Sequence, residues 1–262
     1  MSSVEKDKML TSVSVIMPAY NAAAYIEEAI RSVMAQTYPA WRLLVLDDRS
    51  SDHTVDIVKR LAAEDSRITL YCNEENLGAA RTRNRGLDMC TDGYVAFLDS
   101  DDRWHPEKLA VQVALAEASD ADIVYTSYAI IDIDGKDCRQ PYVVPEHTDF
   151  RCMLRENVIG CSAVLLSPRA ARTYRFPLDF YHEDYCLWLD ILRGGGRAVG
   201  SSRVLTEWRL VNGSRSFDKK NGARRRWRIY REHLHLPWIK SVLSFIGYAF
   251  NGIKKYSKKH KG

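Results

Sequence analysis

The sequence has no uninterrupted apolar run of about 18 residues, the length that a membrane-spanning helix needs. Residues 1–11 also lack the apolar core of a secretory signal peptide. Neither a spanning helix nor a leader is therefore expected, and the composition predicts a cytoplasmic protein. At 262 residues, the chain has the length of one large domain or of a domain with an appendage.

Cysteine is present but never as a Cys-x-x-Cys pair, the spacing typical of zinc and redox sites. Several of the six cysteines lie in apolar runs, where a free thiol behaves as a small hydrophobic group. A reducing compartment therefore fits better than a disulfide-stapled secreted scaffold.

Acidic residues are scarce at the C-terminal end. Residues 218–262 hold thirteen Lys or Arg against two acids, a net charge of +11, whereas the whole chain carries +4 and the remainder therefore −7. This asymmetry favours a basic tail that meets an anionic surface, either membrane or nucleic acid. Because the remainder is acidic, extensive contact with nucleic acid is not expected, and a nucleic-acid-binding module stays only as an alternative.

Strands and helices alternate through the first half of the chain. Short apolar runs typical of buried strands occur at 13–17, 41–46, 67–72, 94–98 and 122–127. Helical patterns lie between them, and the alternation predicts an α/β fold with a mainly parallel central sheet flanked by helices. The second half is less regular, with a hairpin expected at 130–143 and a strand at 203–211.

Carboxylates follow two of these strands. Asp99 and Asp101 come directly after the run at 94–98, and Asp48 follows the run at 41–46. Because the carboxyl ends of parallel strands meet at one edge, where ligands bind, the three acids are expected to converge. Asp101 is the expected ligand of Mg²⁺ or Mn²⁺, ions held by one or two carboxylates together with substrate phosphates. The alternative is a polar turn that caps the next helix.

Two further groups suit a nucleotide. Asp48 can accept a nucleobase N–H, although an aspartate here can equally cap the helix that follows. Arg83, on a helix that begins near Asn76, can meet phosphate oxygens with its planar fork. Its alternative is a solvated basic face, which suits Arg81 and Arg85 better.

The pair Glu183-Asp184 opens a helical pattern. A carboxylate at a helix N-terminus is stabilised as the anion, and this alone can explain the pair. The functional interpretation is a general base that takes a proton from an attacking hydroxyl. His182 beside the pair is expected to be structural or to face an acceptor rather than to bind a metal.

Five motifs occur in a fixed order: Val-Ser-Val-Ile-Met-Pro-Ala-Tyr-Asn at 13–21, Leu-Asp-Asp-Arg-Ser-Ser-Asp at 46–52, Asn-Leu-Gly-Ala-Ala-Arg-Thr-Arg-Asn-Arg-Gly at 76–86, Phe-Leu-Asp-Ser-Asp-Asp at 97–102, and His-Glu-Asp at 182–184. Together they resemble the family 2 glycosyltransferases, which have the GT-A nucleotide-diphospho-sugar fold. The resemblance covers residues 12–216 and extends to bacterial enzymes of teichuronic acid, capsule and O-antigen synthesis.

The resemblance implies a role for each matching position. Residues for the nucleotide sugar are Pro18, Tyr20, Asp48, Arg83, Asp99, Ser100 and Asp101. Asp101, with Asp99, would hold Mn²⁺ or Mg²⁺, and Asp184 would be the base of an inverting single displacement. Residues near the acceptor or the phosphates would be His182, Glu183, Arg209 and Ser214.

One position departs from the family pattern. Arg49 stands where the family usually has a small residue, such as the glycine of Asp-Asp-Gly-Ser. The Gln-x-x-Arg-Trp motif of the processive members is absent from the sequence, so one sugar per acceptor encounter is expected.

The C-terminal segment is expected to form two helices. Residues 1–217 would make the catalytic domain, with a donor half at 12–128 and an acceptor half at 129–217, and 218–262 an amphipathic extension. Pro237 would separate a basic helix at 224–235 from a helix at 238–253. The apolar stripe of this second helix is predicted to contain Trp238, Val242, Phe245, Ile246, Ala249, Phe250 and Ile253. With flanking lysines, residues 224–261 suit an anionic membrane surface; the alternative is packing on the catalytic domain or in a homodimer.

These features together predict a metal-dependent, inverting transferase. It would move a hexose or N-acetylhexosamine, glucose or galactose being favoured, from a UDP-sugar to a glycan on undecaprenyl diphosphate. The expected setting is bacterial surface polysaccharide synthesis at the inner face of the cell membrane. A nucleotidyltransferase on a related sheet is the other enzyme class, but 18–21 lack its glycine-rich, lysine-containing phosphate loop.

Overall fold

The computed structural model describes residues 10–211 and 219–257. Its strands are β1 (Val13–Ala19), β2 (Trp41–Asp47), β3 (Ile68–Cys72), β4 (Tyr94–Phe97), β5 (Arg103–Trp104), β6 (Ile123–Ile131), β7 (Asp137–Tyr142), β8 (His147–Thr148), β9 (Val164–Leu166) and β10 (Ala198–Arg209). Its helices are α1 (Ile26–Met34), α2 (Thr54–Glu64), α3 (Ala79–Asp88), α4 (Lys108–Ser119), α5 (Phe150–Arg155), α6 (Pro168–Thr173), α7 (Glu183–Arg193), α8 (Lys219–Arg228) and α9 (Trp238–Ser257).

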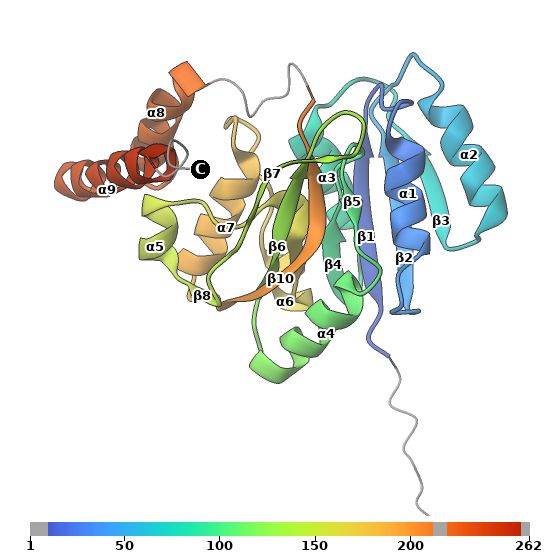
Figure 1. Ribbon diagram of the computed structural model, residues 1–262, viewed down its shortest axis with the longest axis horizontal. Helices are drawn as coiled ribbons and strands as arrows, with labels where there is room; N and C mark the ends of the chain where they lie inside the picture. The colour runs from blue at the N-terminus through green and yellow to red at the C-terminus, as the bar shows by residue number, and fades with distance from the viewer. Residues whose placement is uncertain (1–9, 212–218, 258–262) are drawn as a thin grey trace, which may run out of the picture.

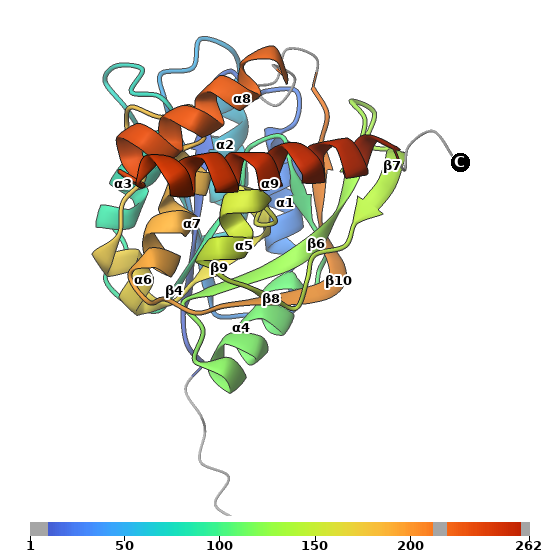
Figure 2. The same cartoon turned by 90° about the vertical axis from the view of Figure 1, so that its left-hand side faces the viewer.

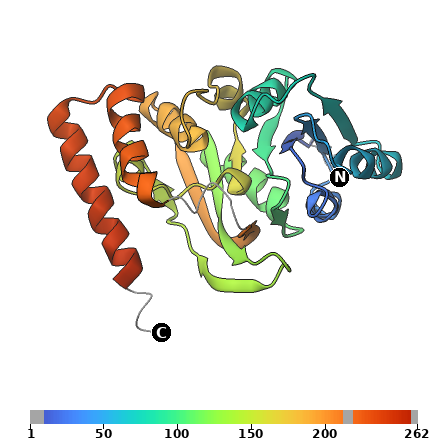
Figure 3. The same ribbon diagram turned by 90° about the horizontal axis from the view of Figure 1, so that it is seen from above.

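One twisted sheet runs through the molecule, and helices cover both of its faces (Figures 1 and 3). The main strand order is β3-β2-β1-β4-β9-β6-β10-β5, with β7 paired to β6 and β8 to β10. The first four strands of this order are parallel, as the alternation of strands and helices predicts. Their carboxyl ends therefore lie at one edge of the sheet.

The second half of the sheet, which the sequence shows as less regular, has mixed strand directions. There, β9 pairs antiparallel with both β4 and β6, and β10 is parallel to β6 but antiparallel to β5 and β8. The short strand β9 enters through a 3₁₀ turn rather than a helical crossover, so it can run against its neighbours. The predicted hairpin is confirmed, with β6 and β7 antiparallel.

Two apolar clusters fill the layers on either side of the sheet. One holds the buried faces of α1, α2 and α4, and the other those of α3, α6 and α7. The central strand β1 is buried along almost its whole length, which explains its nearly continuous apolar sequence. The sheet is consequently a rigid support for the loops at its carboxyl edge.

Arg49 lies in the turn after β2. This residue adopts φ +66°, a left-handed conformation that glycine takes without steric cost, which gives a physical reason for the glycine usual at this position. Asp47 accepts a bond from the Ser50 amide (3.0 Å), and Asn21 accepts one from the Ser51 amide (2.8 Å). These bonds hold the turn against the loop after β1.

The C-terminal extension is joined to the rest of the fold. After α8, a π-helical turn at Ile229–His233 buries Ile229 and Tyr230 in the apolar cluster of α7, together with Leu234 and Leu236. Pro237 separates this turn from α9, as expected, and α9 runs across α5 (Figure 2). The proposed boundary at 217/218 stays a prediction because 212–218 lie outside the described residues.

The predicted apolar stripe of α9 divides into two faces. Val242 and Phe245 are partly buried, and Phe245 packs against the core. The outward face instead consists of exposed apolar residues at helical spacing, namely Ile239, Leu243, Ile246 and Phe250, each 58–69% exposed. The stripe was mispredicted because α9 is apolar on most sides. The side chain of Ile253 lies outside the described part of the chain.

None of the helices in residues 10–211 and 219–257 combines the length and hydrophobicity that crossing a bilayer requires.

Candidate active site

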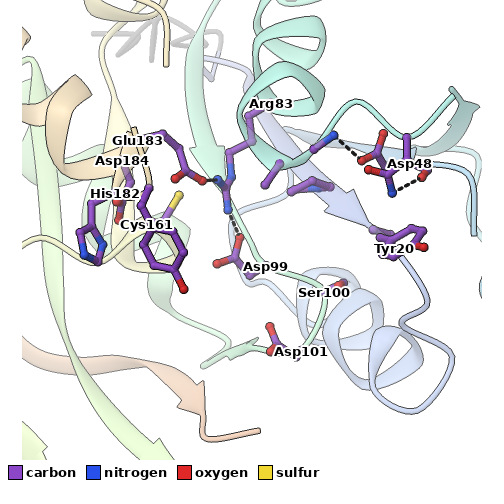
Figure 4. A pocket seen from close by; sticks show the side chains of 16 residues that line it. Tyr20, Asp48, Arg83, Asp99, Ser100, Asp101, Cys161, His182, Glu183 and Asp184 are labelled. Atoms are coloured by element: carbon purple, nitrogen blue, oxygen red, sulfur yellow. Dashed lines mark hydrogen bonds and ion pairs between the residues drawn. The ribbon is translucent and has the colours of Figure 1, made fainter. Parts of the chain in front are cut away.

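A pocket of about 440 Å³ lies at the carboxyl edge of the parallel strands (Figure 4). Its walls come from the ends of β1, β2 and β4, from the start of α3 and from the start of α7. Ten residues singled out in the sequence line it together: Pro18, Tyr20, Asp48, Arg83, Asp99, Ser100, Asp101, His182, Glu183 and Asp184. Distant segments thus meet in one pocket, while their chemical roles remain predictions.

One of the expected residues, Arg209, is not in this pocket, and another is not among the described residues. Ser214 lies outside the described residues. Arg209 is 1% exposed and faces the other side of its strand, where it donates to the backbone oxygens of Asp101 (2.9 Å) and Ile133 (3.1 Å) and to Glu28 (2.7 Å). The predicted contact of Arg209 with phosphate or acceptor would require these bonds to break. In this structure, Arg209 stabilises the acidic loop from the side opposite the pocket.

Asp48 is buried and bonded within the protein. One carboxylate oxygen accepts from Asn73 Nδ2 (2.7 Å) and the Leu77 amide (2.8 Å), and the other accepts from the Gly78 amide (2.8 Å). A carboxylate offers about four acceptor positions, so Oδ2 retains roughly one for a ligand. Asp48 therefore fixes the loop before α3 and still reaches the pocket.

We expect Asp48→Asn to lower the melting temperature of the nucleotide-free protein by about 3–8 °C. An amide would place an N–H₂ group against one of the three buried donors, at a cost of about 1–3 kcal/mol. Thermal unfolding monitored by circular dichroism measures this change. An unchanged melting temperature would mean that the carboxylate does not support the loop, and Asp56→Asn, at an exposed position on α2, is the matched control.

Arg83 connects acids from two elements. Its Nη2 lies 2.5 Å from Asp99 and its Nη1 lies 2.9 Å from Glu183, and the arginine itself is buried (Figure 4). Burial alone would lower the pKa of Arg83, but the facing Cys161, Asp99 and Glu183 hold it well above the ordinary value. Both ends of the guanidinium fork are thus engaged, and Arg83 aligns α7 with the acidic loop.

The acidic loop after β4 is held by further hydrogen bonds. Ser162 accepts from the Asp99 amide (3.0 Å) and donates to Asp102 (2.6 Å), whose other oxygen accepts from the Arg209 amide (2.9 Å). Burial raises the pKa of Asp102 well above its ordinary range, with Asp101 and Asp99 adding to the effect. Asp102 is therefore a structural support beneath the loop.

Asp101 is the acid of this loop that best suits a cation. Burial and the neighbouring Asp99 raise the pKa of Asp101 to about 6, so its ionised form is poorly stabilised by the protein alone. Asp99 already pairs with Arg83. Residues 10–211 and 219–257 contain no cluster of three or more His, Cys, Asp or Glu arranged for a metal. The donor set fits Mg²⁺ or Mn²⁺ that takes one or two carboxylates and completes its shell with phosphates and water.

Asp184 lies at the start of α7 on the opposite wall. Burial and the adjacent Glu183 raise the pKa of Asp184 to about 6, against the hydrogen bond from the Tyr185 amide (2.7 Å) that favours the anion. This pKa suits a general base near neutral pH. Glu183 is the buried partner of Arg83, whereas His182 lies at the pocket surface.

Three site residues were missed in the sequence, and two of them have no clear signal there. Cys161 lines the pocket between Asp99 and Asp184, and Ser162 bonds the acidic loop. Both come from the irregular segment before β9. Asn73 was also missed, although its place directly after β3, where polar residues gather at the sheet edge, is the signal by which it could be found.

Comparison with known proteins identifies the sequence pattern. The family model "Glycosyl transferase family 2" matches residues 14–176. The chain is 37% identical over 243 residues to the putative teichuronic acid biosynthesis glycosyltransferase TuaG of Bacillus subtilis, covering 93% of this chain and 96% of TuaG. It is also 37% identical over 254 residues to WfgD of Escherichia coli, a UDP-Glc:alpha-D-GlcNAc-diphosphoundecaprenol beta-1,3-glucosyltransferase, covering 95% and 96% of the two chains.

Solved structures agree on the fold. The Staphylococcus aureus TarS fragment 1–349 in complex with UDP-GlcNAc superposes with a TM-score of 0.69 at 21% identity, covering 84% of this chain and 64% of that one. The mannosyltransferase PcManGT of Pyrobaculum calidifontis, in complex with GDP-Man and Mn²⁺, gives 0.71 at 20% identity, covering 92% and 70%. The GT-A fold expected from the sequence is thereby confirmed.

Proposed function

The chain belongs to glycosyl transferase family 2, and from this premise we propose that it transfers one hexose or N-acetylhexosamine, with inversion, from a UDP-sugar to a lipid-linked glycan. The observation that carries the proposal is that Asp48, Asp101 and Asp184 line one pocket. The WfgD relative, whose name specifies UDP-glucose and a GlcNAc-diphosphoundecaprenol acceptor, supports this donor and acceptor class. The TuaG and WfgD relatives support a role in bacterial surface polysaccharide synthesis.

We expect the donor to lie along the pocket from its base to its sugar. The uracil would lie against Pro18 and Tyr20, with its N3–H directed to the free position on Asp48 Oδ2. The ribose and diphosphate would extend along Asp99 and Ser100 toward Asp101. This direction brings the anomeric carbon toward Asp184 on the opposite wall.

Each of these residues would have its own role in a single displacement. The acceptor hydroxyl attacks the anomeric carbon, the bond from that carbon to the UDP oxygen breaks, and the hydroxyl proton passes to Asp184. Mg²⁺ or Mn²⁺, held by Asp101 with Asp99 nearby, would supply Lewis-acid stabilisation of the leaving diphosphate. Arg83 would hold Asp99 and the start of α7 in their relative positions during the transfer.

A donor panel tests the proposal. The full-length protein is incubated with Mn²⁺, GlcNAc- or GalNAc-diphospho-lipid and, in turn, UDP-glucose, UDP-galactose, UDP-GlcNAc and UDP-GalNAc, and UDP release is measured with and without acceptor. Acceptor-dependent release with one or two donors is expected. Absence of release with every donor, despite UDP binding, would contradict the proposal.

We propose in addition that α9 docks on the inner face of the cell membrane. Its outward face presents exposed apolar side chains, and α8 is rich in arginine, the combination that binds an anionic interface. Its opposite face packs on α5 and the core, so the outward face is available without unfolding. A lipid-linked acceptor would then be confined to the same surface as the enzyme.

The double variant Leu243→Glu/Ile246→Glu is expected to weaken binding to phosphatidylglycerol vesicles by at least tenfold. Each side chain is about 60% exposed, so burial in a bilayer would contribute on the order of 1–2 kcal/mol each, and charge opposes it. Vesicle co-sedimentation measures the effect. Ile133→Glu changes another exposed apolar residue, on the hairpin, and is the control; equal binding of all three proteins would refute membrane docking by α9.

A further inference from the structure

A second cavity, of about 490 Å³, lies on the other side of Asp184, the proposed base. It shares Asp99, Cys161, His182 and Asp184 with the donor pocket. Asp184 therefore faces both spaces. A group bound in the second cavity can present a hydroxyl to the base from the side opposite the donor.

The sheet supplies an aromatic wall to this cavity. Tyr128 on β6 and Thr206 and Trp208 on β10 point to the same face, because Thr206 pairs with Tyr128 and strand side chains alternate with period two. The rings of Tyr128 and Trp208 lie edge to face, with centroids 6.3 Å apart. Such a wall suits the apolar C–H face of a pyranose, while Thr206 adds a hydroxyl at the same surface.

The C-terminal extension supplies the opposite wall. Arg226 from α8 and Tyr248 from α9 both line the cavity. The Arg226 guanidinium carbon lies 3.9 Å from the Tyr185 ring centre and 4.7 Å from that of Tyr248. Its Nη1 atom is buried and, among the described residues, has no hydrogen-bond partner. This arginine is held between two aromatic rings and has a buried N–H group without an acceptor. Such a group can donate a hydrogen bond to an anionic oxygen.

We propose that this second cavity is the acceptor site and that it recognises a glycosyl diphosphate. The sugar packs against Trp208 and Tyr128 with a hydroxyl toward Asp184, and a diphosphate oxygen accepts from Arg226. The extension then completes the acceptor site rather than serving only as an anchor. This inference rests on the proposed function for the identity of the reaction, but the binding it describes can be measured without turnover.

The test compares two probes that differ in the presence of the diphosphate group: GlcNAc-α-diphosphate on a short alkyl chain, and the neutral GlcNAc α-glycoside of the same chain. For Arg226→Gln, the KM of the diphosphate probe is expected to rise about 10- to 100-fold, the range for losing a charge-assisted hydrogen bond, while that of the neutral probe changes less than twofold. Trp208→Ala is expected to raise the KM of both probes. The KM of the donor should stay unchanged in either variant.

Arg225→Gln is the matched control. This arginine is the sequence neighbour of Arg226 but lines a different cavity, between α3 and α8. A larger effect from Arg225→Gln, or equal effects of Arg226→Gln on both probes, would overturn the inference. Retained UDP binding and melting temperature show that each variant is folded.

Direct titration of the diphosphate probe into the UDP-bound protein separates this inference from the proposed function. Probe binding that Arg226→Gln weakens, without any transfer, would support the acceptor site and contradict the proposed reaction. Transfer by the wild type to the diphosphate and neutral probes with the same KM would support the reaction and overturn the site.

Discussion

Replacing Asp184 by asparagine is expected to lower the rate of sugar transfer by about 10²–10⁴-fold, the range that a general base contributes. The affinity for UDP should stay within about twofold, because the carboxylate lies across the pocket from Tyr20 and Asp48, the residues proposed to hold the uracil (Figure 4). Asparagine retains an oxygen that can accept from the Tyr185 amide, so the start of α7 should keep its form. Single-turnover transfer and calorimetric UDP binding measure the two quantities.

The wild-type rate should also depend on pH in a defined direction. The pKa of Asp184 is raised to about 6, so the carboxyl group proposed as the base is protonated well below pH 6 and ionised above it. Transfer should therefore rise between about pH 5 and pH 7, and this rise should be absent from the residual activity of Asp184→Asn. A variant with more than a tenth of the wild-type rate would show that another group accepts the proton.

The same raised pKa has an opposite consequence for stability. A carboxyl group whose folded pKa exceeds its unfolded value near 4 stabilises the fold below that value, and this contribution is lost as pH rises through about 6. At pH 8, the charged Asp184 should thus cost stability. Asp184→Asn is accordingly expected to raise the melting temperature at pH 8 by a few degrees while it removes activity.

Asp101→Ala is expected to abolish the part of UDP binding that depends on metal. In the wild type, Mn²⁺ should tighten UDP binding by at least 100-fold, whereas in the variant the dissociation constant should be the same with and without Mn²⁺. The reason is that Asp99 is already paired with Arg83, which leaves Asp101 as the acid best placed to hold the ion beside the diphosphate. Titration of UDP at fixed Mn²⁺ and electron paramagnetic resonance of bound Mn²⁺ report on this without turnover.

Asp120→Asn is the control for Asp101→Ala. Asp120 is exposed at the end of α4 in a left-handed conformation that asparagine accepts readily, so its change should leave metal and UDP binding intact. If Asp101→Ala retained the Mn²⁺ enhancement, the ion would have to be held elsewhere. The role of the acidic loop would then need to be reassigned.

The sequence predicts the meeting of the acids because its first half follows simple rules. Three parallel strands with right-handed crossovers bring Asp48, Asp99 and Asp101 to one edge whatever their separation along the chain. The position of Asp184 depends on α7, whose periodic pattern ends at Gly194 as expected. The positions that follow from strand topology can therefore be predicted from the sequence.

The predictions that fail are those in which a shift of one residue along a strand or helix changes the face on which a side chain lies. Arg209 was expected near the phosphates, but adjacent strand residues point to opposite faces, so Trp208 lines the cavity and Arg209 lies behind the acidic loop. In α9, apolar residues occur on most sides, so periodicity alone does not show that Phe245 packs inward and Ile246 outward. Tertiary packing settles both cases.

The burial of Ile229 and Tyr230 within the core has a geometric consequence for an enzyme docked through α9. Because these side chains fix the extension to the same apolar cluster as α7, the catalytic carboxylate would sit at a set height above the bilayer. This fixed distance between the carboxylate and the bilayer would limit the length of acceptor that can react. A glycan whose reactive hydroxyl lies one sugar farther from the lipid would place that hydroxyl beyond the carboxylate. The length of the glycan would therefore help to decide which acceptors are used.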